Sequence, residues 1–334
     1  MDIPARTALR TAAIVFGVLI ALRFLWIAHA IFFVAFLAIL LGLGLSKAAD
    51  WLEAHGVRRG LGAPATLFGG LLLLVLVGML VAPSITSQTG EITRDLPKAM
   101  QSLDQRLHLG PVLAKELRGL TRLLFPVISS VIGAIGGLIV ILFLAMYIAI
   151  EPDLYRNGIL HLVPHGARSR AEDVLDTLRD MLRQWLLARL LAMLAIGAIT
   201  AIGLFALRIK GAGALALLAG VLEIIPFFGP IASAIPAVAI AAADSPQKAI
   251  GVIVLYTIVQ QLEGHLITPL ILEKRLDIPP VLTIISVSAM GIVFGVIGML
   301  IAEPLLAATL VVTKMLYVQD VVHDDVSVGK ENGT

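Results

Sequence analysis

Long apolar segments without charged residues dominate this chain of 334 residues. A helix needs about 20 apolar residues to cross about 30 Å of hydrocarbon, and several of the segments reach that length. Backbone polar groups cannot be satisfied by lipid, so spanning segments form helices or closed barrels, and uninterrupted apolar runs favour helices. The pattern therefore predicts an all-α polytopic membrane protein. The segments free of Asp, Glu, Lys and Arg are 24–46, 60–90, 123–150, 190–207, 224–243 and 278–302.

The segments predict about six full spans and two broken blocks, roughly eight apolar segments in all. The first apolar region is interpreted as a hairpin of two helices, 11–28 and 30–46. A cleaved signal is the alternative, but Arg23 interrupts the first stretch and a second apolar stretch follows it directly. The other expected spans are 62–82, 125–150, 187–207 and 249–270.

Two polar segments have apolar residues at helical spacing and predict amphipathic helices that do not span. The first is 84–122, where Ile92, Leu96 and Met100 recur. The second is 165–189, which leads directly into the span at 187–207. Such helices lie on the membrane surface or pack against a partner. The apolar stripe of the second segment comprises Ala171, Val174, Leu175, Leu178, Met181, Leu182, Trp185 and Leu186.

The two broken blocks, 212–243 and 279–318, contain prolines that a straight helix does not tolerate. The first block predicts two half-helices with an irregular turn near 225–230. The second is expected to break near Glu303-Pro304, with arms 280–300 and 304–318. Both are interpreted as re-entrant hairpins or broken helices.

These elements divide the chain into six parts: spans at 1–83, a polar segment at 84–122, a span at 123–150, a cytoplasmic amphipathic helix at 151–186, a transport unit at 187–318 and a polar tail at 319–334. Among the shorter polar segments, Lys and Arg are more numerous on the side of the N-terminus. By the positive-inside rule, both termini are expected in the cytoplasm.

Composition narrows the function classes. A formal net charge of +2 gives no indication of nucleic-acid binding. With no cysteine, thiolate metal sites and cysteine nucleophiles are excluded, and we expect no cofactor and no metal. We find neither a GxSxG nucleophile turn nor an HExxH zinc helix, which disfavours a membrane enzyme.

The candidate pathway residues gather around the broken blocks and the span at 249–270. Irregular backbone at membrane depth lines protein or a water-filled cavity, and half-helix ends bind substrates and ions near the midplane. Intramembrane carboxylates are functional candidates, although each can instead satisfy backbone groups or pair with a basic residue. The pathway candidates are Glu223, Pro226, Gly229, Pro230, Gln260, Gln261, Glu263, His265, Thr268 and Glu303, and the hinge or gate candidates are Pro236, Pro269, Gly295, Gly298 and Pro304.

The C-terminal third resembles the autoinducer-2 exporter (AI-2E) family of bacterial membrane proteins. The resemblance rests on Glu223-Ile-Ile-Pro-Phe-Phe-Gly-Pro230, on Gln260-Gln-Leu-Glu-Gly-His-Leu-Ile-Thr-Pro269, and on the glycines Gly291, Gly295 and Gly298 before Pro304. The sequence departs from the family pattern at His265, where relatives commonly have Asn, and at Glu303, where a small or apolar residue is expected.

The resemblance implies a multi-span transporter of the bacterial inner membrane that exports a small polar solute such as autoinducer-2. Some relatives exchange sodium or lithium for protons, which is the alternative activity. The absence of an ATP-binding GxxxxGK[ST] loop points to an ion or solute gradient as the energy source. A passive channel or a membrane scaffold stays open as a different class. The expected partners are the lipid bilayer, the solute or a monovalent cation or proton, and other copies of the chain in a homo-oligomer.

Overall fold

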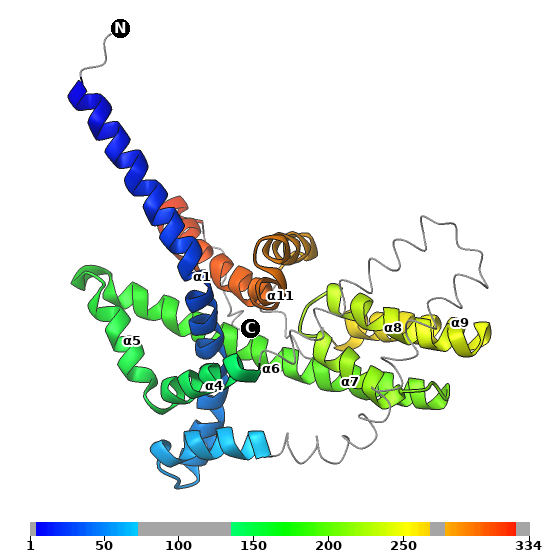
Figure 1. Ribbon diagram of the computed structural model, residues 1–334. Helices are drawn as coiled ribbons and strands as arrows, with labels where there is room; N and C mark the ends of the chain where they lie inside the picture. Colours follow the sequence, from blue (N-terminus) through cyan, green and yellow to red (C-terminus); the bar gives the residue numbers. More distant parts are fainter. Residues whose placement is uncertain (1–4, 73–134, 268–277, 325–334) are drawn as a thin grey trace.

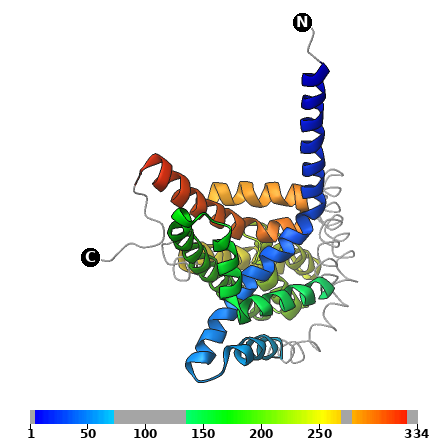
Figure 2. The same cartoon turned by 90° about the vertical axis from the view of Figure 1, so that its left-hand side faces the viewer.

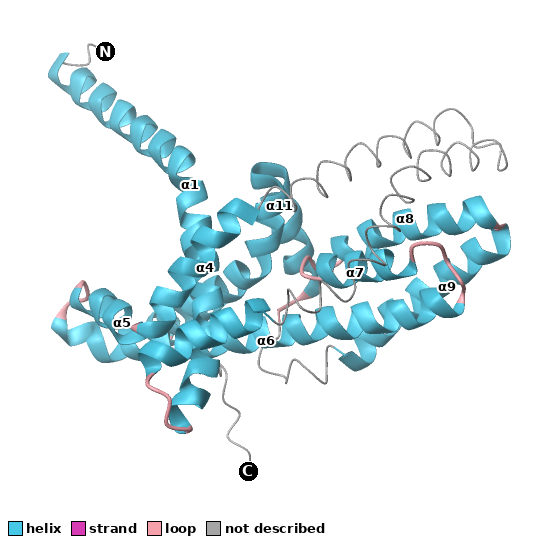
Figure 3. Ribbon diagram, turned by 60° about the horizontal axis from the view of Figure 1, so that its bottom comes forward, coloured by secondary structure: helices cyan, strands magenta, loops and turns pink. Residues whose placement is uncertain are grey.

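A computed structural model of the protein describes residues 5–72, 135–267 and 278–324, and every regular element in these ranges is a helix (Figure 3). The all-α fold predicted from the sequence is therefore confirmed for these residues. Four of the described helices are long and apolar enough to cross a membrane: Trp26–Ala54, His165–Ala206, Pro246–Leu266 and Pro280–Val322. The predicted amphipathic helix at 84–122 lies outside the described residues.

The N-terminal region forms a single long helix, α1 (Ala5–Ala54). The prediction of a two-helix hairpin is wrong: the sequence between 28 and 30, Ala-His-Ala, holds no glycine or proline that would end a helix. The first half of α1 projects from the rest of the molecule (Figures 1 and 2). After a turn at Gly56, whose φ is 90°, a further helix begins at residue 59 and is described to residue 72.

Two short helices and a 3₁₀ turn precede the long helix α6. α4 (Ile135–Ile150) ends before Glu151, where the sequence predicted the end of a span. α5 (Pro152–His161) begins with proline at its first position, where the missing N–H costs nothing. A short 3₁₀ turn, η1 (His165–Ala167), then precedes α6.

The helix α6 (Arg168–Ala206) runs without a break from the amphipathic segment 165–189 into the apolar span 187–207, as predicted. Its apolar stripe is buried together with Leu40 of α1 and Val311 of the C-terminal helix α11. Burial of this stripe packs α1, α6 and α11 around one hydrophobic core.

Three helices follow α6 (Figure 1). They are α7 (Ala212–Leu222), α8 (Phe228–Asp244) and α9 (Pro246–Leu262), which a π-helical turn, η2 (Glu263–Ile267), extends. Of these, α7 and α9 pack against α6, while α8 packs on α7 and α9. Ser245 caps α9 by accepting a hydrogen bond from the backbone N–H of Lys248 at 3.2 Å. A second core fills the space between these helices, with Leu204, Leu215, Ile240 and Val252 at its centre.

The last region comprises α11 (Pro280–Thr313) and a π-helical continuation, η3 (Lys314–Val322). The guanidinium of Arg170 on α6 holds η3 by donating to the carbonyl oxygen of Met315 and to Gln319 Oε1, both at 2.8 Å, and it pairs with Asp320. The start of α6 and the end of the described chain are therefore tied together.

Candidate functional site

The first predicted helix break is confirmed: α7 ends at Leu222 and α8 begins at Phe228. Between them the chain makes a three-residue turn in which the N–H of Phe228 donates to the carbonyl oxygen of Pro226 at 2.7 Å. Phe227, at the centre of this turn, has φ 62° and ψ −43°, which is close to the rare and strained classic γ-turn. Strained backbone persists only where the surrounding structure enforces it, and it clusters at functional sites.

Gly229 makes a close packing of the two half-helices possible. A Cβ atom at this position would lie 1.9 Å from the carbonyl oxygen of Leu222. Only glycine allows α8 to begin directly against the end of α7. Pro230 follows in the first turn of α8, and Pro236 is buried inside the same helix. The glycine and the prolines predicted as pathway or hinge residues therefore shape this hairpin.

The second break is present but at a different residue from the one predicted. α11 is non-helical at Gly295, where φ is 66° and ψ is −149°, and it continues as helix through Pro304. The prediction of a break near Glu303-Pro304 is wrong because proline bends a helix without necessarily ending it, whereas this combination of φ and ψ is essentially restricted to glycine. The two arms on either side of Gly295 fold back on each other.

Contacts between residues far apart in sequence define this second hairpin. The hydroxyl of Ser286 donates to the carbonyl oxygen of Ala302 at 3.4 Å. A Cβ atom on Gly298 would lie 2.3 Å from the carbonyl oxygen of Met290. Val287 and Ala302 share a buried cluster with Ile225, which belongs to the first break. The two hairpins therefore touch each other.

Arg189 of α6 joins the carboxylates of the two hairpins. Its Nη2 lies 2.6 Å from Oε2 of Glu303, and its Nη1 lies 3.4 Å from Oε1 of Glu223. The Arg189 side chain is 11% exposed and that of Glu223 is 0% exposed. A buried charge requires a partner, and here one guanidinium serves two acids that are 80 residues apart in the chain.

Glu263 completes the acidic group. It acts electrostatically on Glu223, together with Glu303, and it accepts a hydrogen bond from Nε2 of Gln260 at 2.8 Å. The structure thus brings together four of the predicted pathway residues, Glu223, Gln260, Glu263 and Glu303. We call Arg189 and the three glutamates the carboxylate cluster.

Other predicted residues lie away from this cluster or outside the described chain. Gln261 and His265 are exposed, and His265 Nδ1 lies 3.1 Å from the backbone carbonyl oxygen of Gln261. Thr268 and Pro269 fall outside the described residues. No group of three or more His, Asp or Glu residues in the described ranges could hold a metal ion.

Sequence reasoning missed Arg189. It stands immediately before the charge-free stretch 190–207, where the predicted amphipathic helix 165–189 overlaps the predicted span 187–207. The missing signal was the requirement for charge balance: two carboxylates in apolar blocks need a cation nearby, and Arg189 is the basic residue that borders the neighbouring apolar run.

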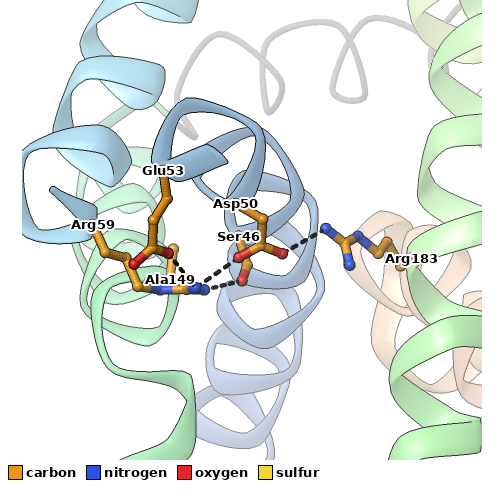
Figure 4. A network of polar contacts seen from close by, with 6 residues as sticks. All are labelled: Ser46, Asp50, Glu53, Arg59, Ala149 and Arg183. Atoms are coloured by element: carbon orange, nitrogen blue, oxygen red, sulfur yellow. Dashed lines mark hydrogen bonds and ion pairs between the residues drawn. The ribbon is translucent and has the colours of Figure 1, made fainter. Parts of the chain in front are cut away.

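A second polar network lies where α1, α4, α6 and the helix that begins at residue 59 meet (Figure 4). Arg59 is its centre: Nη1 donates to Asp50 Oδ1 at 2.6 Å, Nη2 to Ser46 Oγ at 2.6 Å, and Nε to the carbonyl oxygen of Ala149 at 3.1 Å. Asp50 also accepts from Arg183 of α6 at 3.1 Å. The network joins four segments, so its role is to fix their relative positions.

Several long apolar helices, two helical hairpins and a buried charge cluster between helices are features of a multi-pass membrane transporter. The model of the AI-2E family transporters matches residues 14–317. The chain belongs to this family.

Curated relatives support the assignment. The chain is 27% identical over 275 residues to "Putative transport protein YueF" of Bacillus subtilis (strain 168), which covers 73% of this chain and 74% of that protein. It is 30% identical over 162 residues to "Putative transport protein YrrI" of the same organism, covering 48% of this chain and 46% of that protein. It is also 23% identical over 304 residues to "Putative transport protein sll0063" of Synechocystis, covering 83% of this chain and 75% of that protein.

Proposed function

We propose that this protein is a secondary transporter of the bacterial inner membrane that moves a small polar solute, such as autoinducer-2, with both termini in the cytoplasm. The observation that supports this proposal is the meeting of two helical hairpins at Arg189. Two packed helix breaks with buried charge are typical of sites at which transporters bind substrates and ions. The motion is proposed to be an elevator-like or rocking displacement of the unit 187–318 against the N-terminal helices.

Other copies of the chain are proposed as partners in a homo-oligomer. Large apolar side chains on α1, α9 and α11 are exposed, among them Phe32, Ile253 and Ile292. In the membrane such faces would contact lipid or a neighbouring subunit.

Solute counterflow in proteoliposomes tests the proposal. Vesicles loaded with unlabelled solute should take up labelled solute faster than empty vesicles, because a carrier exchanges bound solute across the membrane and a passive pore does not. Autoinducer-2 and other small polyols are the solutes to compare. A protein that gives no counterflow with any of them, or equal uptake into loaded and empty vesicles, would contradict the proposal.

A matched pair of glycine variants connects the counterflow to the first hairpin. Gly229→Ala forces a Cβ atom against the Leu222 carbonyl oxygen, so transport should fall strongly. Gly158→Ala places a Cβ atom in open space on α5 and should transport as the wild type does. Equal transport by the two variants would remove the first hairpin from the pathway.

The alternative activity, exchange of sodium or lithium for protons, draws on the same carboxylate cluster. It is favoured by the excess of acid over base there, three glutamates beside one arginine. An imposed sodium gradient that moves protons in vesicles without any solute would favour this alternative.

A further inference from the structure

The inference concerns Glu223, and it rests on the proposed transport function. The Glu223 side chain is completely buried. Its Oε1 atom faces Arg189 at 3.4 Å, beyond the usual length of a charge-assisted hydrogen bond. Its Oε2 atom is buried and has no hydrogen-bond partner among the described residues. A buried carboxylate oxygen without a donor is costly, so this atom needs a further positive group.

The charged groups around Glu223 leave that need unmet. Arg189 on α6 is the cation, and it binds Glu303 on α11 more closely, at 2.6 Å. Glu263 in η2 adds a second negative neighbour and interacts directly with the Glu223 carboxyl group. When all three carboxyl groups are ionised, the cluster carries two negative charges more than its one guanidinium balances. Glu223 is the fully buried member, so a further positive charge is needed most at its carboxyl group.

A proton meets the geometry better than a metal ion does. Two carboxyl groups in contact share a proton readily, because the protonated one donates its O–H to the other. Hard cations such as Ca²⁺ and Mg²⁺ require about six or more oxygen ligands, and no group of three or more His, Asp or Glu residues in the described ranges is placed to hold a metal ion. One oxygen of Glu263 is already occupied by the Gln260 amide.

We propose that Glu223 and Glu263 share one exchangeable proton, and that this proton is the ion coupled to transport. On release, the O–H bond of Glu223 breaks and its electron pair stays on the carboxylate. The proton passes to Glu263, which is only partly buried, and from there to water. The Glu223 carboxylate then attracts Arg189 away from Glu303, so the proton determines which hairpin the arginine holds.

Infrared difference spectroscopy of the full-length protein in lipid tests the shared proton without any solute. A pH step should reveal the carbonyl band of a protonated, hydrogen-bonded carboxylic acid. The band should disappear in Glu223→Gln, shift in frequency in Glu263→Gln and stay unchanged in Glu151→Gln, since Glu151 is exposed and its side chain makes no capping hydrogen bond to α5. A wild-type protein without the band, or a band that persists in both cluster variants, would overturn the proposal.

Vesicle assays separate this proposal from the proposed function. In Glu223→Gln, accumulation driven by a pH gradient should fall by about tenfold relative to the wild type, which is an ordinary size for coupling between sites. Glu263→Gln, which leaves the buried residue intact, should lower the same accumulation if Glu223→Gln does not fold. If the wild-type protein shows counterflow but its accumulation of solute does not depend on the pH gradient, proton coupling is refuted and the proposed solute transport is not. Absence of counterflow would refute the proposed solute transport. The infrared band would still show whether Glu223 and Glu263 share a proton.

Discussion

At position 189, one guanidinium holds two acids that come from different hairpins. The arrangement is asymmetric, with the partly exposed Glu303 at 2.6 Å and the fully buried Glu223 at 3.4 Å. Removing one member of a buried charge group is far more costly than removing an exposed pair, because the remaining charges lose their compensation.

Replacement of Arg189 by Met should therefore lower the free energy of unfolding by about 3–5 kcal/mol. Replacement of Arg156, whose pair with Asp176 is largely exposed, should cost about 0–1 kcal/mol. Thermal unfolding of the two purified variants in one detergent measures the difference. The deficit of Arg189→Met should shrink as pH falls, since protonated carboxyl groups no longer need the cation. Equal losses in the two variants at neutral pH would contradict a buried role for Arg189.

At the scale of elements, the sequence predicted which blocks are broken and located one break correctly. The first was found because Pro226, Gly229 and Pro230 stand close together in an apolar run. The second was misplaced because Pro304 is the stronger breaker by propensity. Gly295 is one of several glycines in its block, and its backbone conformation is set by the packing of the two arms, which no local pattern encodes.

Gly295→Ala should open or distort the second hairpin, whereas Pro304→Ala should preserve it. Spin labels on cysteines introduced at Leu282 and Thr309 report the geometry, and the chain has no other cysteine. The hairpin brings the two labels together, but a straight helix would separate them by about 40 Å. Short distances in Pro304→Ala and in the parent protein, with longer or broader ones in Gly295→Ala, are expected. A long distance between the two labels in the parent protein would contradict the second hairpin.

At the scale of the whole molecule, the turn after α6 lies against the turn between α8 and α9. The ammonium group of Lys248 donates to the carbonyl oxygen of Arg208 at 3.0 Å and also pairs with Asp244. This contact places both turns at the same end of the helix bundle, so under the proposed orientation both lie on the side of the membrane opposite to the termini. The arrangement of helices around the carboxylate cluster was beyond sequence patterns, since it depends on which hairpins meet.

An impermeant maleimide should therefore label Gln247→Cys in intact cells. Leu162→Cys, between α5 and η1 and 86% exposed, should react only after the membrane is permeabilised. The parent chain, which has no cysteine, provides the background. Labelling of both cysteines in intact cells, or of Leu162→Cys alone, would contradict the proposed orientation.

The uninterrupted course of α6 has a mechanical consequence. Arg183, which binds Asp50 of α1, and Arg189 are six residues apart on this helix, or about 9 Å along its axis. A rigid rod of that length transmits any axial slide or rotation from one arginine to the other. Under the proposed function, weakening the ion pair between Asp50 and Arg183 would therefore change the apparent affinity for the transported solute through α6.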